Sequence, residues 1–469
     1  MHVLRPLLLC LAGAFAAGCA PVPEDTGDAA ADDPPGAAPE TIVIEGARVF
    51  DGHGELGPVS LVIQDGRIAR IIEPGSADAP PVGAERIDYA GRFIIPGLVS
   101  AHSHVGNTSG TEHGDRFYTR DNVVRDLRQF QAYGVTTVTS LGLNGEGFFD
   151  IRAEVNADPS LGAQLFGAGP GIGVTDGAPP AGGMGLENDP VARPATAEDA
   201  RQAIRDQVDG GIDLVKLWVD DLGGSAPQMA PEAYRAAIDE AHRHGVKVAA
   251  HIHDMQPAAE LVAAGVDIIA HGVRDQAMDP GLVEAMASSN TWYVPTVFIN
   301  EANYWFAENP DRLDDPFVAN ALHPALRAQF QDQAWRDSVL AGAQLAREKA
   351  AVDTNLANLR AAHEGGVAIG FGTDSGAMPQ RVIGFAEHRE LELMTEAGFT
   401  PEQALAVATR DSARLLGLED RGTLAVGRRA DFIVLEANPL QDIRNTRGIV
   451  AVWQAGQQVA GPIGEYTNR

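Results

Sequence analysis

The chain has 469 residues, enough for one large barrel with an accessory domain. Its 64 acidic and 35 basic side chains give a formal net charge of -29, which argues against nucleic acid as a partner because nothing offsets phosphate repulsion. The only two cysteines are Cys10 and Cys19, so a disulfide framework and a thiolate metal site are both excluded. Any metal must be held by nitrogen and oxygen.

The first 40 residues predict export. An apolar run from Leu7 to Ala17 follows a short start with one arginine, and it is too short to span a bilayer. It ends in Ala16-Ala17-Gly18-Cys19, which resembles a bacterial lipobox, with plain secretion and cleavage near Ala20 as the alternative. We expect a signal peptide at 1–18 and a flexible tether at 19–40. The protein would be an outer-membrane lipoprotein, touching the membrane only through a lipid anchor at Cys19, or a periplasmic protein.

Short β-rich runs separated by Asp-Gly and Pro-Gly turn signals follow from Thr41 onward. Similar short runs return near the C-terminus, at 431–435, 449–453 and 457–459. These patterns predict that 41–96 and 421–469 together form one small β-sandwich domain.

Between these segments, eight strand-like runs alternate with amphipathic helical patterns. The alternation predicts an α/β fold, a (β/α)8 TIM-like barrel at 97–420. A doubly wound open sheet is the competitor, but no Gly-rich dinucleotide turn follows the first strand. The predicted strands are Ile94 to His104, Gly134 to Leu141, Leu165 to Gly169, Ile212 to Val219, Val246 to His253, Val266 to His271, Trp292 to Phe298 and Val367 to Thr373.

Four histidines lie at the predicted ends of these strands. His102 and His104 are two residues apart, so both side chains leave the same side of the first strand. His251 and His271 close two later strands, and catalytic sites on such barrels occupy this carboxyl-terminal rim. Four imidazoles suit zinc or a similar divalent metal. His253 shares the side of His251 and is a rival ligand, although we prefer a substrate contact for it.

Asp374 ends the last predicted strand. It is either a helix-capping or turn aspartate, or a metal ligand that takes a proton from water and passes it to the leaving amine. Lys216 lies inside an apolar run, where an unpaired ammonium is costly and the neutral amine is favoured. A neutral amine can add carbon dioxide and form a carbamate, an anionic ligand able to bridge two metals. The alternatives are a lysine paired with Asp220 or Asp221, or one that reaches out of the strand end.

These motifs resemble those of the amidohydrolase superfamily. His102-Ser103-His104 after Ile95-Pro96-Gly97-Leu98 resembles its opening signature, and Gly372-Thr373-Asp374-Ser375-Gly376 resembles its last-strand signature. The resemblance extends over roughly 41–459 and is nearest to the imidazolonepropionase-related branch, which includes Xaa-Pro dipeptidases. It implies that His102, His104 and Asp374 hold one zinc. His251 and His271 would hold the other, with carboxylated Lys216 and a hydroxide bridging the two. Without the carbamate, a single-metal site is expected.

The expected function is hydrolysis of an amide or cyclic amide bond in a small molecule, with hydroxide attacking the carbonyl and Asp374 carrying the proton. A dipeptidase of the Xaa-Pro type or a lactonase would use the same site, and a ligand-binding lipoprotein with an inactive barrel is the non-enzymatic alternative. Arg274 is expected either to grip a substrate carboxylate or to form a surface ion pair. The aromatic run Tyr304-Trp305-Phe306 is interpreted either as part of a lid or as packing. The oligomeric state is left open.

Overall fold

The computed structural model describes residues 41–465. The predicted signal peptide at 1–18, the tether at 19–40 and the lipid-carrying Cys19 lie outside the described residues. Among the residues that are described, no helix is long and apolar enough to cross a membrane.

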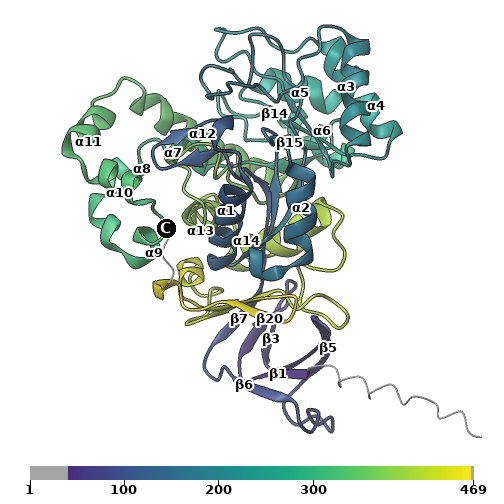
Figure 1. Cartoon of the computed structure of the whole chain (residues 1–469), viewed down its shortest axis with the longest axis vertical. Helices are drawn as coiled ribbons and strands as arrows, with labels where there is room; N and C mark the ends of the chain where they lie inside the picture. The colour runs from purple at the N-terminus through teal and green to yellow at the C-terminus, as the bar shows by residue number, and fades with distance from the viewer. Residues whose placement is uncertain (1–40, 466–469) are drawn as a thin grey trace, which may run out of the picture. The chain divides into compact units, whose positions relative to one another are not determined.

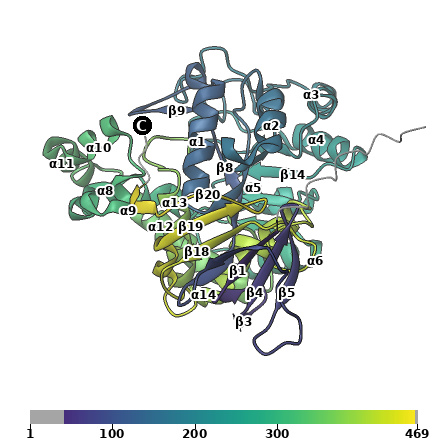
Figure 2. The same cartoon turned by 60° about the horizontal axis from the view of Figure 1, so that its bottom comes forward.

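The two ends of the described chain form two β-sheets, one from the N-terminal segment alone and one from both ends (Figures 1 and 2). The strand β7 pairs in parallel with β2 and antiparallel with β18, so segments from both ends share one sheet. Alternate residues of these strands point inward, and the rings of Phe432 and Trp453 stack at 5.4 Å. The four-stranded sheet contains β5 (Arg67–Ile72), β4 (Ser60–Gln64), β1 (Thr41–Glu45) and β6 (Glu85–Asp88). The six-stranded sheet contains β20 (Gln457–Ala460), β19 (Ile449–Gln454), β18 (Phe432–Leu435), β7 (Phe93–Pro96), β2 (Arg48–Phe50) and β3 (Glu55–Pro58).

Eight parallel strands form the barrel, which confirms the predicted α/β class. They fall into two sheets, ordered β12-β11-β8 and β13-β14-β15-β16-β17. Parallel bridges join Ile172 to Leu217 and Ser103 to Ser375, and so close the two sheets into a ring. The strands are β8 (Leu98–Ser103), β11 (Val135–Ser140), β12 (Gln164–Gly167), β13 (Val215–Trp218), β14 (Val248–His251), β15 (Ile268–Ala270), β16 (Trp292–Val294) and β17 (Ala368–Ile369).

The first predicted strand, Ile94 to His104, is in fact two strands divided at Gly97. The part before it, β7, belongs to the six-stranded sheet, and the part after it, β8, belongs to the barrel. A Cβ atom on Gly97 would lie 2.3 Å from the Thr136 hydroxyl oxygen, so only glycine permits this close approach. The Gly97 amide also donates to the Asp431 carbonyl, which ties the crossing point to the C-terminal segment.

Helices alternate with the barrel strands, and several begin at sequence-encoded caps. The Thr196 and Thr400 side chains each complete a capping box at the start of a helix. A small apolar cluster that includes Ala101, Leu214 and Val294 fills the barrel interior. The barrel helices are α1 (Arg120–Ala132), α2 (Phe148–Ala157), α3 (Ala197–Asp209), α4 (Pro231–Arg243), α5 (Met255–Ala263), α6 (Pro280–Ser289), α12 (Leu345–Glu364), α13 (Phe385–Glu396), α14 (Pro401–Ala406) and α15 (Ser412–Leu415).

A helical excursion separates β16 from α12. Its aromatic side chains are packed: the rings of Phe306 and Phe330 stack at 4.3 Å within the excursion, and the ring of Trp305 lies 4.5 Å from that of Phe385 at the start of the barrel helix α13. Tyr304 is also buried. Packing, rather than a lid, is therefore the role of this aromatic run. The excursion contains α7 (Phe298–Glu301), α8 (Trp305–Glu308), α9 (Pro316–Ala319), α10 (Pro324–Gln331) and α11 (Gln333–Leu340). A separate hairpin, β9 (Thr108–Ser109) and β10 (Glu112–His113), follows the first barrel strand.

Candidate active site

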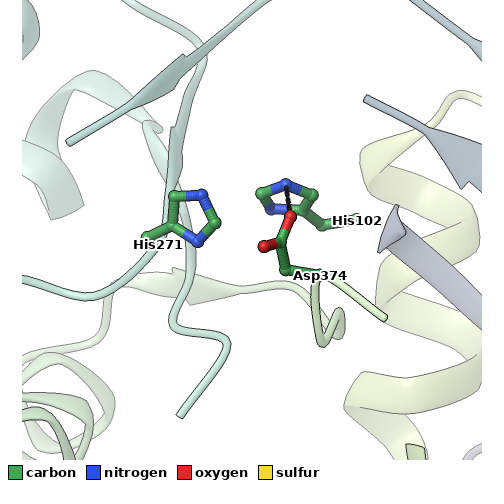
Figure 3. A group of neighbouring side chains, drawn as sticks. All are labelled: His102, His271 and Asp374. Atoms are coloured by element: carbon green, nitrogen blue, oxygen red, sulfur yellow. Dashed lines mark ion pairs between the residues drawn. The ribbon is translucent and has the colours of Figure 1, made fainter. Parts of the chain in front are cut away.

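Three buried side chains from distant parts of the sequence meet at the carboxyl ends of the barrel strands (Figure 3). His102 lies in β8, His271 directly follows β15, and Asp374 follows β17. One potential ligand atom from each lies within 4.8 Å of the others. Parallel strands bring their carboxyl ends to the same rim, so the barrel itself assembles this group.

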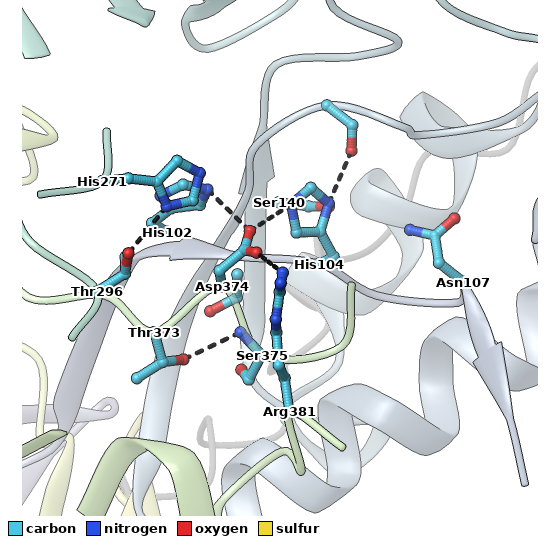
Figure 4. A network of polar contacts seen from close by, with 12 residues as sticks. His102, His104, Asn107, Ser140, His271, Thr296, Thr373, Asp374, Ser375 and Arg381 are labelled. Atoms are coloured by element: carbon cyan, nitrogen blue, oxygen red, sulfur yellow. Dashed lines mark hydrogen bonds and ion pairs between the residues drawn. The ribbon is translucent and has the colours of Figure 1, made fainter. Parts of the chain in front are cut away.

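The Asp374 carboxylate contacts both histidines of the first strand (Figure 4). Its Oδ1 lies 3.1 Å from His102 Nε2 and 3.0 Å from His104 Nε2. The other ring nitrogen of His104 lies 3.2 Å from the Gly142 carbonyl oxygen, which can only accept, so this nitrogen carries the hydrogen. His104 Nε2 and the Asp374 carboxylate therefore face the same point, and this pair of nitrogen and oxygen donors fits a divalent metal.

Electrostatics keep the imidazoles in the form that binds metal. Burial and the nearby Lys216 lower the pKa of His102 to about 3. Burial and the neighbouring His102 likewise hold the pKa of His271 well below its ordinary value. The Nδ1 atom of His271 lies 2.8 Å from the Thr296 hydroxyl, which leaves Nε2 free to face the site. Both histidines are thus neutral at physiological pH.

Backbone strain concentrates at the same rim. His271, Thr296 and Asp374 have φ angles of 112°, 44° and 58°, in the region that favours glycine. For a β-branched residue such as Thr296 this conformation is especially unfavourable. Each such residue costs roughly 1–3 kcal/mol, and surrounding contacts must hold it in place.

Helix α13 supplies those contacts through the buried carboxyl groups of two glutamates. Glu387 accepts hydrogen bonds from the Thr373 and Ser375 hydroxyls, at 2.6 and 2.7 Å, on either side of Asp374. One turn later, Glu390 accepts from the backbone amides of residues 297 and 298, each at 2.8 Å, directly after Thr296. Burial raises the pKa of Glu390 to about 8. One helix therefore braces the strand ends that carry Asp374 and the partner of His271.

Lys216 is fully buried beside the histidines. Its Nζ lies 3.4 Å from His102 Nε2, and burial lowers its pKa to about 7. Asp220 bonds to His251 instead, and Asp221 accepts from the Gly224 amide, so neither residue pairs with this lysine. The pairing considered from the sequence is absent from the described residues. A large share of neutral amine at physiological pH is the consequence.

His251 is brought to the site but makes a different contact from the predicted one. Its ring lies 4.5 Å from the ring of His271, while its Nε2 lies 2.8 Å from Asp220 Oδ2. Although burial favours the neutral acid, this hydrogen bond lowers the pKa of Asp220. His251 can thus offer Nε2 to a metal only if Asp220 gives up this contact.

The two residues predicted to contact substrate both line the cavity. His253 Nδ1 lies 2.6 Å from Asp254 Oδ1, and its side chain is partly exposed. Arg274 is buried and donates to the backbone carbonyls of Ile252 and Gly272, while its Nε has no partner among the described residues. Because Arg274 is buried, the alternative prediction that it forms a surface ion pair is wrong.

Arg381 is a site residue that the sequence did not reveal. It forms an ion pair with Asp374 Oδ2 (Figure 4). Burial opposes ionisation, but Arg381 and the two imidazoles hold the pKa of Asp374 well below its ordinary value. Because Arg381 follows Asp374 by seven residues in an irregular loop, no periodicity or motif marks it.

A cavity of about 820 Å³ opens over this group. Its lining includes five of the six predicted metal ligands; the sixth, His102, lies buried beneath them. A cavity of this size suits a small organic molecule and is too small for a folded partner. The ligands in the lining are His104, Lys216, His251, His271 and Asp374.

Comparisons with known proteins agree with this geometry. The chain is 28% identical to an uncharacterized protein of Mycobacterium tuberculosis over 82% of this chain and 87% of that one. It is 24% identical to the ochratoxinase of Aspergillus niger over 90% of this chain and 87% of that one. The structure of a Xaa-Pro dipeptidase with methionine bound in its active site superposes with a TM-score of 0.69 at 25% identity, covering 89% and 99% of the two chains. The amidohydrolase family model matches residues 93–459. On this match and this site, the chain belongs to the amidohydrolase family.

Proposed function

We propose that the protein is a zinc-dependent enzyme that hydrolyses the amide bond of a small carboxylate-bearing molecule outside the cytoplasm. The observation that carries the proposal is the convergence of His102, His271 and Asp374 beneath a cavity of about 820 Å³, with Lys216 buried beside them. Nitrogen and oxygen donors of this kind suit zinc.

The proposed ligand set divides between two metal positions. His102, His104 and Asp374 would hold one ion, and His251 and His271 the other. Lys216 would bridge them as a carbamate. The contacts of Asp374 with both first-strand imidazoles support the first position. The ring contact between His251 and His271 supports the second, provided that Asp220 releases His251. A bound divalent cation supplies Lewis acidity, which polarises the scissile carbonyl and makes water acidic enough to react near neutral pH.

The carbamate is supported by the state of the Lys216 amine. At a pKa of about 7 roughly half of the amine is neutral at pH 7, against about one part in several thousand for an ordinary lysine. Only the neutral amine adds carbon dioxide. The reaction forms an N–C bond and releases one proton, and the anionic product removes the cost of a buried ammonium.

The chain's own residues supply proton transfer and orientation. Asp374, ionised and held by Arg381, accepts a proton from the attacking water and delivers it to the leaving nitrogen. Arg274 lines the cavity, and its guanidinium would bind a carboxylate of the substrate. His253 is placed to contact the substrate from the same side of the cavity lining.

A dipeptide of the Xaa-Pro kind fits these roles, because it carries both an amide and a carboxylate. A Xaa-Pro dipeptidase and an ochratoxinase are both among the similar proteins, which supports an amide over a lactone. The presence of all six predicted ligands in one region disfavours an inactive binding protein.

The proposal is tested by metal content and activity together. Zinc-loaded wild type is expected to hold two ions per chain and to hydrolyse members of a panel of dipeptides, N-acyl amino acids and lactones. Lys216→Ala should hold one ion or none and lose activity. Lys247→Ala is the matched control, because Lys247 is a half-buried lysine that donates to the Leu415 carbonyl away from the cavity lining. Unchanged metal content and activity in Lys216→Ala would refute the carbamate.

Export and lipidation are proposed from the N-terminal sequence alone. Processing before Cys19 predicts a mature chain with a lipid-modified N-terminus in the membrane fraction. Cys19→Ala should move the protein to the soluble extracytoplasmic fraction. Wild-type protein that keeps residues 1–18 would contradict both forms of export.

A further inference from the structure

The cavity has one rigid aromatic surface directly beside the reacting groups. The indole of Trp218 packs against Gly142 and Gly171, where an added Cβ atom would lie 2.4 Å from a ring carbon in each case. The Lys216 Nζ atom lies 5.5 Å from the centre of the same ring. Because larger residues at the two glycines would displace the indole, its position is fixed before any substrate binds.

Apolar side chains continue outward from this indole along the cavity. We call them the apolar wall. Four of its members, Leu143, Ala178, Met184 and Trp218, also belong to a hydrophobic cluster with Leu186 and Val191, so the wall is supported from behind. The apolar wall consists of Leu143, Ala178, Pro179, Pro180, Met184, Trp218 and Leu222.

Leu222 is the most unusual member of the apolar wall. Its residue is 37% exposed, and its φ angle of 55° lies in a conformation that is unfavourable for leucine. Its amide donates to Asp220 Oδ1 at 2.8 Å, and the other oxygen of Asp220 bonds to His251. Leu222 is therefore held in a strained, exposed position by a residue that also contacts the candidate metal site.

Few large apolar side chains are exposed in the described part of the chain, and that of Leu222 lies at the cavity. The large apolar residues that are exposed within 41–465 are Leu56, Val82, Leu222, Leu340 and Val426. Of these, Leu222 alone lines the cavity. The exposure is unfavourable in the free protein, and contact with an apolar group would remove this surface from water.

We infer that the substrate carries a bulky apolar group, aromatic or branched aliphatic, close to the scissile amide, and that Leu222 determines this specificity. The inference rests on the proposed function and deepens it. The Trp218 indole would contact the part of this group nearest the amide, and Leu222 would cover its outer end. One methylene in an apolar pocket changes kcat/KM by about tenfold or more, so the selectivity should be large.

The experiment compares three amides on the zinc-loaded full chain. N-acetylglycine has no bulky group, N-benzoylglycine has one on the acyl side, and N-acetylphenylalanine has one on the amino-acid side. We expect kcat/KM for at least one of the bulky amides to exceed that for N-acetylglycine by about tenfold or more. Whichever of the two bulky amides is hydrolysed faster identifies whether the acyl half or the amino-acid half of the substrate faces the apolar wall. Equal values for all three would overturn the inference and leave the proposed function standing.

The matched pair of variants is Leu222→Asn and Leu340→Asn. Asparagine is close to leucine in size and tolerates a positive φ, so the first variant removes apolarity while keeping the backbone. Leu340 has nearly the same exposure, 39%, and lies outside the cavity lining. The preference for the bulky amide should fall about tenfold in Leu222→Asn and stay unchanged in Leu340→Asn. An unchanged preference in both would overturn the role of Leu222.

A third outcome separates this inference from the proposed function. If no amide is hydrolysed, the proposed function fails, and the apolar wall is then tested by calorimetric binding of 3-phenylpropanoate and propanoate. Tighter binding of the aromatic acid that is lost in Leu222→Asn would support the apolar wall. Equal binding of the two acids would overturn it.

Discussion

Replacing Lys216 with methionine is expected to stabilise the metal-free protein while destroying its metal site. Methionine has nearly the length of lysine and no charge, so it can fill the same buried space. In the metal-free protein, burial lowers the pKa of Lys216 from 10.5 to about 7. The folded state thus binds fewer protons than the unfolded state between these two pH values, and wild-type stability rises with pH across that window.

The displacement of the pKa sets the size of the effect. A pKa shift costs about 1.36 kcal/mol per unit, so the shift of Lys216 corresponds to roughly 5 kcal/mol. This is the free energy that folding loses when the lysine must either be buried with its proton or give the proton up. The cost is fully present below pH 7 and vanishes above pH 10.5. Lys216→Met should therefore raise the free energy of unfolding by up to about 5 kcal/mol at pH 7 and by much less at pH 9.5.

Urea unfolding of chelator-treated protein at both pH values measures this difference. Lys247→Met is the comparison variant: burial also lowers the pKa of Lys247, but this lysine lies away from the cavity and its donation to the Leu415 carbonyl is lost, so it should not give the gain of Lys216→Met. Added zinc should stabilise wild type and leave Lys216→Met nearly unaffected. A variant less stable than wild type at pH 7, or a gain that is equal at both pH values, would refute the reasoning about the buried amine.

Three further predictions concern residues around the site. Glu387→Ala leaves the Thr373 and Ser375 hydroxyls and the Gly384 amide without their acceptor. The free energy of unfolding, measured by urea denaturation, should therefore fall by about 3–5 kcal/mol and recover in part in Glu387→Gln. Thr296→Val removes the partner of His271 Nδ1 and should weaken zinc affinity about 10- to 100-fold in a chelator competition, whereas Thr296→Ser should retain it; equal affinities would count against the orienting hydrogen bond. Asp374→Asn should lower kcat by about 10²- to 10⁴-fold in steady-state assays, and a variant with near-normal kcat would exclude Asp374 as the proton carrier.

The barrel and the positions of the histidines were predictable because both depend on local patterns. Alternating strand and helix periods identify the barrel, and a residue that ends a strand, such as His271, necessarily reaches the rim. The family resemblance that first grouped these residues is confirmed by the family match. The predicted domain boundary between residues 96 and 97 coincides with the point where the strand divides, but the predicted strand Ile94 to His104 was drawn across it, because the apolar run is continuous.

The contacts between distant side chains were not predictable in the same way. The pairing of Asp220 with His251 and of Arg381 with Asp374 depends on how loops from different strands fold over the rim. Nothing in the sequence distinguishes Glu387 from an ordinary helix residue, since acidic side chains on helices are usually solvated. Only the packing of α13 against the barrel shows that this carboxylate is buried and used.

The sheet that joins β7 to β18 also constrains how the molecule is made. As the chain emerges, β2 can pair with one edge of β7 at once, but the other edge waits for a strand roughly 340 residues later. At about 5–20 residues per second, that interval lasts from roughly 20 seconds to about a minute. During it β7 is an open, fully apolar edge, which other chains can add to. Chains that end before residue 432 should therefore aggregate even though every barrel strand is present. Pairing of β18 with β7 is what removes this exposed edge.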